Sequence, residues 1–367
     1  MGSLVVAEKL AAARKLGRAL AADADSGIDS VYTGGSLTAG LGNATSDADV
    51  FVLVAPGSAI GEQTTQYSVD GHRVDVERYQ LTEIEALVAE LAEFELRRDN
   101  LPTLHKLPDT LDLVLRLSSA ETLVGSERLT ALRERVTESL PAIRRTAVNH
   151  AAISINGYLE DFLGAAAEGD LDTAAFTGQS LVAYAGKAVA AAAGDLYFSN
   201  KWIYKQLART PIEGFPVDLF TYYQRGAWTA DGTTAAEGLA LFVQTCAAVA
   251  QLLCNADAPL AAWPGWRPGS AEEGRWRSTG FCVLRTGDGI LLHWELGRQL
   301  LLKEAPAFVW ALCDGRSVDG IVEAVRQLGD SVPTLKGLSR VRIESILTAL
   351  QTKGLVGTEP FSLLSTV

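Results

Sequence analysis

The chain has 367 residues and a formal net charge of −12, because 44 Asp and Glu outnumber 32 Lys and Arg. Neither the totals nor any local run supplies the basic stripe that nucleic-acid binding needs, which argues against a polymerase or tRNA-processing role. The four cysteines form no C-x-x-C pair, and the four histidines are too few and too scattered for a His-based metal site. Reduced core cysteines are typical of an intracellular protein.

Targeting and membrane segments are not expected. Residues 1–27 are apolar at helical spacing but interrupted by charges, which predicts an amphipathic helix rather than a targeting peptide. The longest run of small apolar residues, 181–194, is too short to cross a bilayer and contains Lys187. We therefore expect a cytoplasmic, soluble protein with no membrane partner.

Residues 1–115 alternate strand-like and helix-like segments and predict an α+β domain. Segments 30–35 and 49–55 are β-branched and apolar, and 65–79 reads as a hairpin that turns at Asp70-Gly71.

The rest of the chain divides by composition and hydrophobic pattern into three parts. Residues 116–258 lack strand signals and predict a helical bundle. Residues 259–277, with three prolines and three glycines, predict a linker. Residues 278–360 show three short strands followed by three helices, which predicts a compact third domain with a winged-helix-like outline.

Two aspartates one residue apart enter an apolar strand. Residues i and i+2 of a strand share a face, so Asp47 and Asp49 project together while Ala48 and Val50 pack inward. Two carboxylates on one face repel each other unless a cation lies between them. Mg²⁺, which prefers carboxylates together with phosphate oxygens, is the expected cation.

The turn before these aspartates and the strand after them extend the pattern. Gly34-Gly35-Ser36 lets backbone amides and a hydroxyl approach a phosphate, and a helix beginning at Ser36 would aim its N-terminus at the same anion. Asp75 and Glu77 share a face of a later strand, and either supplies the third carboxylate of a two-metal site. A plain loop and a solvated strand edge are the alternative interpretation.

An apolar-Gly-Ser turn, ten residues, Asp-x-Asp and a later strand aspartate together resemble the DNA polymerase β-type nucleotidyltransferase superfamily, over residues 30–78. The resemblance implies that Gly35 and Ser36 hold the β- and γ-phosphates of ATP or another NTP. It implies that Asp47 and Asp49 bind two Mg²⁺ ions, and that Asp75 binds the catalytic ion and acts as base. Asp75 matches the pattern better than Glu77 because valines flank it.

The helical region that follows is similar in arrangement to that of antibiotic nucleotidyltransferases. Lys201 and Lys205 lie one helical turn apart beside Trp202 and Tyr204, which predicts a cationic contact to the triphosphate. Two simply solvated lysines are the alternative.

The third domain resembles the PqqD-like peptide-binding domain, also called the RiPP recognition element. The order of strands and helices, Asp314-Gly315, and a terminal Leu-x₃-Gly-Leu-Val carry this resemblance. It implies that a leader peptide adds as a strand along 298–303, against the helix 340–353. The implied peptide-binding residues are Arg298, Leu300, Leu302 and Arg340.

This domain has two alternative interpretations. A winged helix that binds DNA is disfavoured, because residues 281–367 hold nine Lys and Arg against nine Asp and Glu. A domain that only caps the bundle or dimerises is the other alternative.

Together the resemblances imply an enzyme that transfers a nucleoside monophosphate to a ribosomally made precursor peptide recruited through its leader. A nucleotidyltransferase for a small hydroxylated molecule, such as an aminoglycoside or lincosamide, is the alternative, with the third domain structural. A peptide escort that only senses nucleotide is a second alternative, disfavoured by the complete set of carboxylates.

Overall fold

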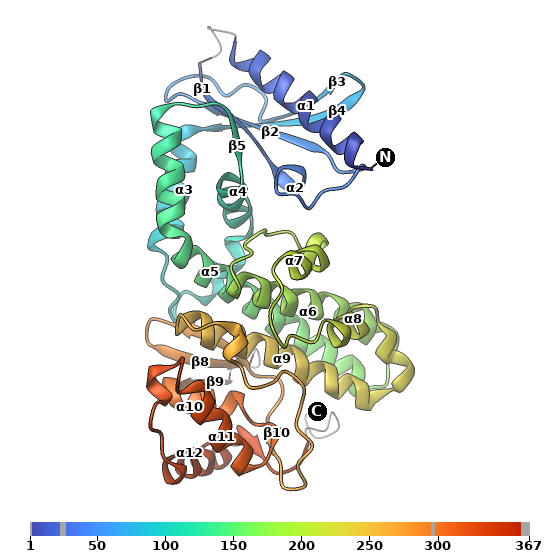
Figure 1. Cartoon of the computed structure of the whole chain (residues 1–367), viewed down its shortest axis with the longest axis vertical. Coiled ribbons are helices and arrows are strands. Elements are labelled where there is room, and N and C mark those ends of the chain that lie inside the picture. Colours follow the sequence, from blue (N-terminus) through green and yellow to red (C-terminus); the bar gives the residue numbers. More distant parts are fainter. Residues whose placement is uncertain (1, 23–26, 295–297, 361–367) are drawn as a thin grey trace. The chain divides into compact units, whose positions relative to one another are not determined.

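The computed structural model describes residues 2–22, 27–294 and 298–360, which form an α+β chain with open sheets, as predicted. The chain groups into two compact units, and Figure 1 shows the elements of each. The first comprises residues 1–94, 107–143 and 197–205, and the second comprises 95–106, 144–196 and 206–367. The predicted boundaries after 115 and 258 do not coincide with these units, because each unit gathers segments that are distant in the sequence.

The first unit is built on one five-stranded sheet of order β3-β4-β2-β1-β5, in which only β2 and β4 are parallel neighbours. Its elements are α1 Gly2–Ala21, β1 Ile28–Gly34, α2 Gly35–Thr38, β2 Ala48–Val54, β3 Thr64–Val69, β4 His72–Gln80, α3 Leu81–Glu93, α4 Pro108–Ser118 and β5 Glu121–Val124.

The two faces of this sheet differ in what covers them. Val50 of β2 and Val74 and Val76 of β4 pack with α1 in one buried cluster, so α1 lies along that face (Figure 1). On the opposite face Tyr32 and Phe51 stack with ring centroids 5.0 Å apart. Because side chains alternate along a strand, the carboxylates of β2 and β4 lie on the face away from α1.

The predicted hairpin is confirmed. Val69 of β3 pairs with His72 of β4, which leaves Asp70 and Gly71 as the two turn residues. Their φ angles are 50° and 80°, the left-handed conformation that Asp and Gly tolerate and that a two-residue hairpin of this type requires.

The prediction that residues 116–258 contain only helices is wrong in one place. Glu121–Val124 forms β5, which pairs antiparallel with β1 and ends the sheet. Four residues are too few for a period of two to stand out from neighbouring helices, so this strand depends on its tertiary partner.

The second unit contains the predicted helices and the C-terminal region. Its helices are the later part of α5 Glu127–Ala167, with α6 Leu171–Ala192, α7 Ile203–Arg209 (from Gln206), α8 Val217–Gln224 and α9 Thr233–Asn255. The helix α9 is the core of this unit and packs on α6. Its length and composition also fit a membrane span, but 89% of its most apolar window is buried, as expected of a core helix.

The predicted order of three strands then three helices is confirmed. A sheet of order β7-β8-β9 precedes α10, α11 and α12, and a second small sheet has the order β10-β6-β11. The bounds are β6 Arg275–Arg277, β7 Cys282–Thr286, β8 Gly289–Trp294, β9 Arg298–Leu302, α10 Glu304–Ala311, β10 Asp314–Arg316, α11 Val318–Leu328, α12 Arg340–Thr352 and β11 Val356–Gly357.

The predicted linker 259–277 is not a free connection. Trp263 and Trp266 are buried, and the N–H of Gly269 donates to the carbonyl of Asp314 at 2.9 Å. The end of the segment is the strand β6, which pairs with β10 and β11. Parts of this Pro- and Gly-rich segment are therefore packed and hydrogen-bonded to the C-terminal region, which composition alone does not predict.

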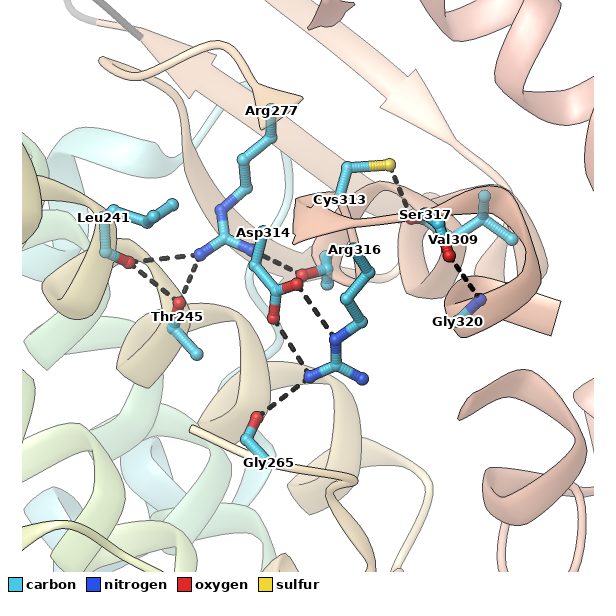
Figure 2. Close-up of polar contacts among 11 residues, drawn as sticks. Leu241, Thr245, Gly265, Arg277, Val309, Cys313, Asp314, Arg316, Ser317 and Gly320 are labelled. Atoms are coloured by element: carbon cyan, nitrogen blue, oxygen red, sulfur yellow. Dashed lines mark hydrogen bonds and ion pairs between the residues drawn. The ribbon is translucent and has the colours of Figure 1, made fainter. Parts of the chain in front are cut away.

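Arg277 of β6 anchors this packing. Its side chain is fully buried, with the residue 1% exposed, and Figure 2 shows its guanidinium beside Leu241 and Thr245 of α9. It donates to Gln244 Oε1 at 2.6 Å, to the carbonyl of Leu241 at 3.1 Å, to the hydroxyl of Thr245 and to the carbonyl of Ala311. Helix α9 and the C-terminal strands are thus joined through one cation.

Candidate functional site

The turn at Gly35 and the carboxylate of Asp49 lie in direct contact. Gly35 has a φ of +74°, and a Cβ at this position would lie 1.9 Å from Asp49 Oδ2. Only glycine fits, both for the backbone conformation and for the space. The expected helix starts at Gly35 but has only four residues, too few for a helix dipole to contribute much to phosphate binding.

Strand register places the backbone positions of three of the predicted carboxylate residues side by side. Asp49 of β2 is the direct partner of Asp75 of β4 in the parallel pair, and Asp47 stands just before β2. Ala48 and Val50 are buried on the α1 side, as predicted. The register leaves Glu77 two pairs further along, opposite Phe51.

Asp49 is the electrostatic centre of this group. Burial is the largest cause that raises the pKa of its carboxyl group, Arg116 opposes it, and the nearby carboxylates of Glu77, Asp75 and Asp47 add to it, so that the pKa is about 7. A buried carboxylate among other carboxylates lacks sufficient positive charge around it. Oxygen ligands with a deficit of cation suit Mg²⁺, so the residues fit the metal that the sequence implies.

Arg73 supplies part of the missing charge. Its guanidinium pairs with Asp47, and its Nε lies 3.8 Å from Asp75 Oδ1, which also accepts from Gln66 Nε2 at 2.9 Å. Across residues 2–22, 27–294 and 298–360, no three His, Cys, Asp or Glu side chains converge as a ready metal cluster. The Arg73 pair explains this in part, because it engages Asp47 from the side of β4.

A second arginine, which sequence reasoning missed, lies beside Glu77. Arg116 of α4 places Nη2 2.8 Å from Asp112 Oδ2 and Nη1 3.7 Å from Glu77 Oε1. Burial opposes its charge, but Asp112, Asp49 and Glu77 outweigh this effect and raise its pKa. The spacing of Asp112 and Arg116 on one helix was the only sequence signal, and it also fits an ordinary surface pair.

The segment 197–205 belongs to the first unit although its flanking residues belong to the second. Within it, Lys205 Nζ donates to the carbonyl of Leu41 at 2.6 Å and to that of Gly42 at 3.3 Å. Lys205 thus holds the loop after the Gly-Ser turn through carbonyls, an alternative to the predicted triphosphate contact. Lys201 is exposed, and its Nζ lies 4.9 Å from the centroid of the Trp202 ring.

Tyr197, in the same segment, is a further residue that sequence reasoning missed. Its phenol shares a hydrogen bond with the side chain of Ser36. Burial raises its pKa to about 12, with Asp112 and Asp49 acting in the same direction and Arg116 against them. Ser36, predicted to contact phosphate, is therefore positioned from a segment distant in sequence.

The predicted peptide-docking edge is a sheet edge. Among the described residues β9 pairs only with β8. Arg298 lies over two aromatic rings, with its guanidinium carbon 5.5 Å from the centroid of Phe281 and 5.9 Å from that of Trp294. Leu300 and Leu302 are half-buried, whereas Leu301 on the opposite face is 44% exposed.

The helix predicted to flank the peptide, 340–353, packs mainly on other helices. Helix α12 packs on α10 and α11, and its first residue, Arg340, pairs with Asp319 of α11 and with Glu344 at 2.8 Å. The structure therefore engages Arg340 in ion pairs within the helical layer, and β9 supplies the exposed edge.

Comparisons with known proteins add no family. No protein-family model matches the chain, and no curated protein matches it in sequence.

Proposed function

We propose that the chain is a metal-dependent nucleotidyltransferase of the polymerase β type, which transfers a nucleoside monophosphate from ATP or another NTP and releases pyrophosphate. The observation that carries this proposal is the register of β2 and β4, which sets Asp49 beside Asp75 with Asp47 next to them. The contact of Gly35 with the Asp49 carboxylate supports it, because it joins the phosphate-type turn to the carboxylates.

The residues have distinct parts in this proposal. Asp47, Asp49 and Asp75 hold Mg²⁺, which when bound neutralises charge on the triphosphate and favours attack on its α-phosphorus. The N–H groups of the Gly35-Ser36 turn and the Ser36 hydroxyl donate to phosphate oxygens. Asp75 accepts the proton of the acceptor hydroxyl.

The proposed acceptor is a ribosomally made precursor peptide whose leader pairs with β9. The unpaired edge of β9 offers backbone hydrogen bonds, and Arg298, held over Phe281 and Trp294, offers a fixed positive charge. An edge strand alone is also a feature of many structural sheets, so the acceptor requires its own test.

A small hydroxylated acceptor is the second candidate. It is favoured by the packing of 259–277 and Arg277, which makes the C-terminal region part of the second unit and gives it a structural role. Deleting residues 278–367 would expose the core around α9, so deletion does not separate the two candidates.

The first test needs no acceptor. Calorimetry with a non-hydrolysable ATP analogue should show binding that depends on Mg²⁺ in the wild type and is lost in Asp49→Asn. Absence of Mg²⁺-dependent binding of every NTP analogue tried would overturn the proposed reaction.

The second test identifies the acceptor class. The full chain is incubated with Mg²⁺, mixed NTPs and either precursor peptides encoded beside its gene or a panel of hydroxylated small molecules, and products are weighed by mass spectrometry. A peptide that gains one nucleoside monophosphate with wild type but not with Asp47→Asn supports the first candidate. Modification of small molecules alone supports the second.

A further inference from the structure

Two carboxylates of β4 compete for the same part in the proposed site. Asp75 and Glu77 lie on one face of the strand, where Asp75 pairs with Asp49 of β2 and Glu77 pairs with Phe51. The pair Asp49–Asp75 lies beside the Gly-Ser turn, and the pair Phe51–Glu77 is the next pair on the same face, two residues further along the strands. Whether Glu77 can join the proposed metal ligands therefore depends on the contacts that its carboxylate makes.

Glu77 is held on both of its oxygens. Its Oε2 accepts from the hydroxyl of Tyr79 at 2.6 Å, and its Oε1 lies 3.7 Å from Nη1 of Arg116. Asp75, by contrast, has both of its described contacts on one oxygen, Oδ1, which accepts from Gln66 Nε2 at 2.9 Å and lies 3.8 Å from Nε of Arg73; Gln66 and Arg73 are both exposed.

Arg116 is itself fixed in place. Its other branch pairs with Asp112 at 2.8 Å, one turn earlier on α4, and its guanidinium carbon lies 5.8 Å from the centroid of the Phe51 ring. Since Phe51 is the register partner of Glu77, the guanidinium lies over the second pair of the sheet, while its charge also acts on Asp49 of the first pair.

We infer that Arg116 is a positioning residue that, with Tyr79, holds Glu77 outside the metal ligand set, so that Asp75 alone completes the set with Asp47 and Asp49. The inference rests on the proposed function. It assigns Glu77 the part of an anchor for Arg116 rather than that of a ligand. A carboxylate held by a guanidinium and a phenol is a poor metal ligand, because binding would first have to break both contacts.

The test uses Mn²⁺ as the probe, with its binding to the full chain measured by electron paramagnetic resonance, independently of activity. In the wild-type background, Asp75→Asn should weaken Mn²⁺ binding by about tenfold or more, and Glu77→Gln by less than about threefold. In the Arg116→Met background Glu77 is released, and Glu77→Gln should then weaken Mn²⁺ binding by about tenfold.

This conditional effect separates positioning from a general loss of structure or a general change of charge. Arg116→Lys keeps the positive charge, and in this background Glu77→Gln should have almost no effect on Mn²⁺ binding. Arg128→Met breaks a similar pair with Glu85 in the same unit. In this background, too, Glu77→Gln should have little effect on Mn²⁺ binding. If Arg116→Met does not fold, the comparison of Glu77→Gln with Asp75→Asn in the wild type still decides the ligand.

Two outcomes would overturn the inference while leaving the proposed function intact. One is that the wild type binds Mn²⁺ and that Glu77→Gln and Asp75→Asn weaken this binding equally. The other is that Glu77→Gln has no effect on Mn²⁺ binding in the Arg116→Met background. A wild type that binds neither Mn²⁺ nor an NTP analogue overturns the proposed function and, with it, the inference.

Discussion

The carboxylate face of the first unit and the Arg277 cluster of the second place charge in opposite ways. Around Asp49, several carboxylates from β2, β4 and α4 share Arg73 and Arg116, and burial and like charges both raise the pKa of Asp49 to about 7. Around Arg277, a single guanidinium is satisfied by Gln244, Thr245 and two carbonyls. Burial lowers its pKa to about 10, while Asp314 acts in the opposite direction.

The difference distinguishes a proposed binding site from a structural contact that connects segments of the chain. Charges of one sign held together cost stability, and such an arrangement is typical of functional sites, in keeping with the proposed metal site. A buried cation whose donors meet neutral acceptors connects the segments that carry those acceptors. Arg316 also joins two segments, but through an ion pair: it pairs with Asp314 at 2.9 Å and donates to the carbonyl of Gly265 at 3.1 Å (Figure 2).

The largest expected effect is at Asp49. Asp49→Asn should lower nucleotidyl transfer by about 10²–10³-fold, because a carboxylate that holds the charge-neutralising ion is lost. The same change should leave the thermal unfolding midpoint without Mg²⁺ unchanged or raised, because it removes a buried charge among like charges. Pyrophosphate release and a thermal melt measure the two effects.

The matched control for this change is Asp70→Asn in the hairpin turn, where Asn also tolerates the positive φ. It should alter neither readout. Transfer retained above a tenth of the wild-type rate in Asp49→Asn would remove Asp49 from the site.

At Arg277 the comparison predicts the reverse pattern. Arg277→Met should lower the free energy of unfolding by roughly 2–4 kcal/mol, because it leaves buried acceptors on α9 and at Ala311 without donors. Urea denaturation measures this loss. Arg275→Met, on the same strand but with backbone partners at 3.2 and 3.4 Å and partial exposure, should cost less than about 1 kcal/mol. Equal losses at the two positions would contradict the proposed anchoring role.

An intermediate effect is expected at the edge of β9. Arg298→Glu should weaken binding of the precursor peptide by about tenfold, since it reverses the charge held over the Phe281 and Trp294 rings. Fluorescence anisotropy with the labelled peptide measures the change. Arg326→Glu on α11, an exposed residue paired with Glu323, is the control. Unchanged affinity in Arg298→Glu would move the docking surface away from β9.

The smallest expected effect is at Arg73. Its pairing with Asp47 competes with a metal ion for the same carboxylate, so Arg73→Met should tighten Mn²⁺ binding by about two- to threefold, as for a surface ion pair. Arg128→Met should have no effect on Mn²⁺ affinity. Weaker Mn²⁺ binding in Arg73→Met would mean that Arg73 supports the ligand set rather than competing with the ion.

The sequence by itself determined the elements whose signals are local. The hairpin at Asp70-Gly71, the alternating burial around Asp47 and Asp49, and the order of strands and helices after Phe281 follow from side-chain period and turn chemistry within short windows. These signals also brought the carboxylates onto one face, because a period of two fixes which side chains share a face.

Only the tertiary structure decided which distant groups meet. It paired β5 with β1, packed the Pro- and Gly-rich 259–277 against β10, directed Lys205 to the Leu41 and Gly42 carbonyls, and set Arg116 beside Glu77. The physical reason is that periodicity records whether a side chain is buried, but not its partner. Long flexible side chains such as Arg and Lys find that partner only after strands and helices have taken their positions.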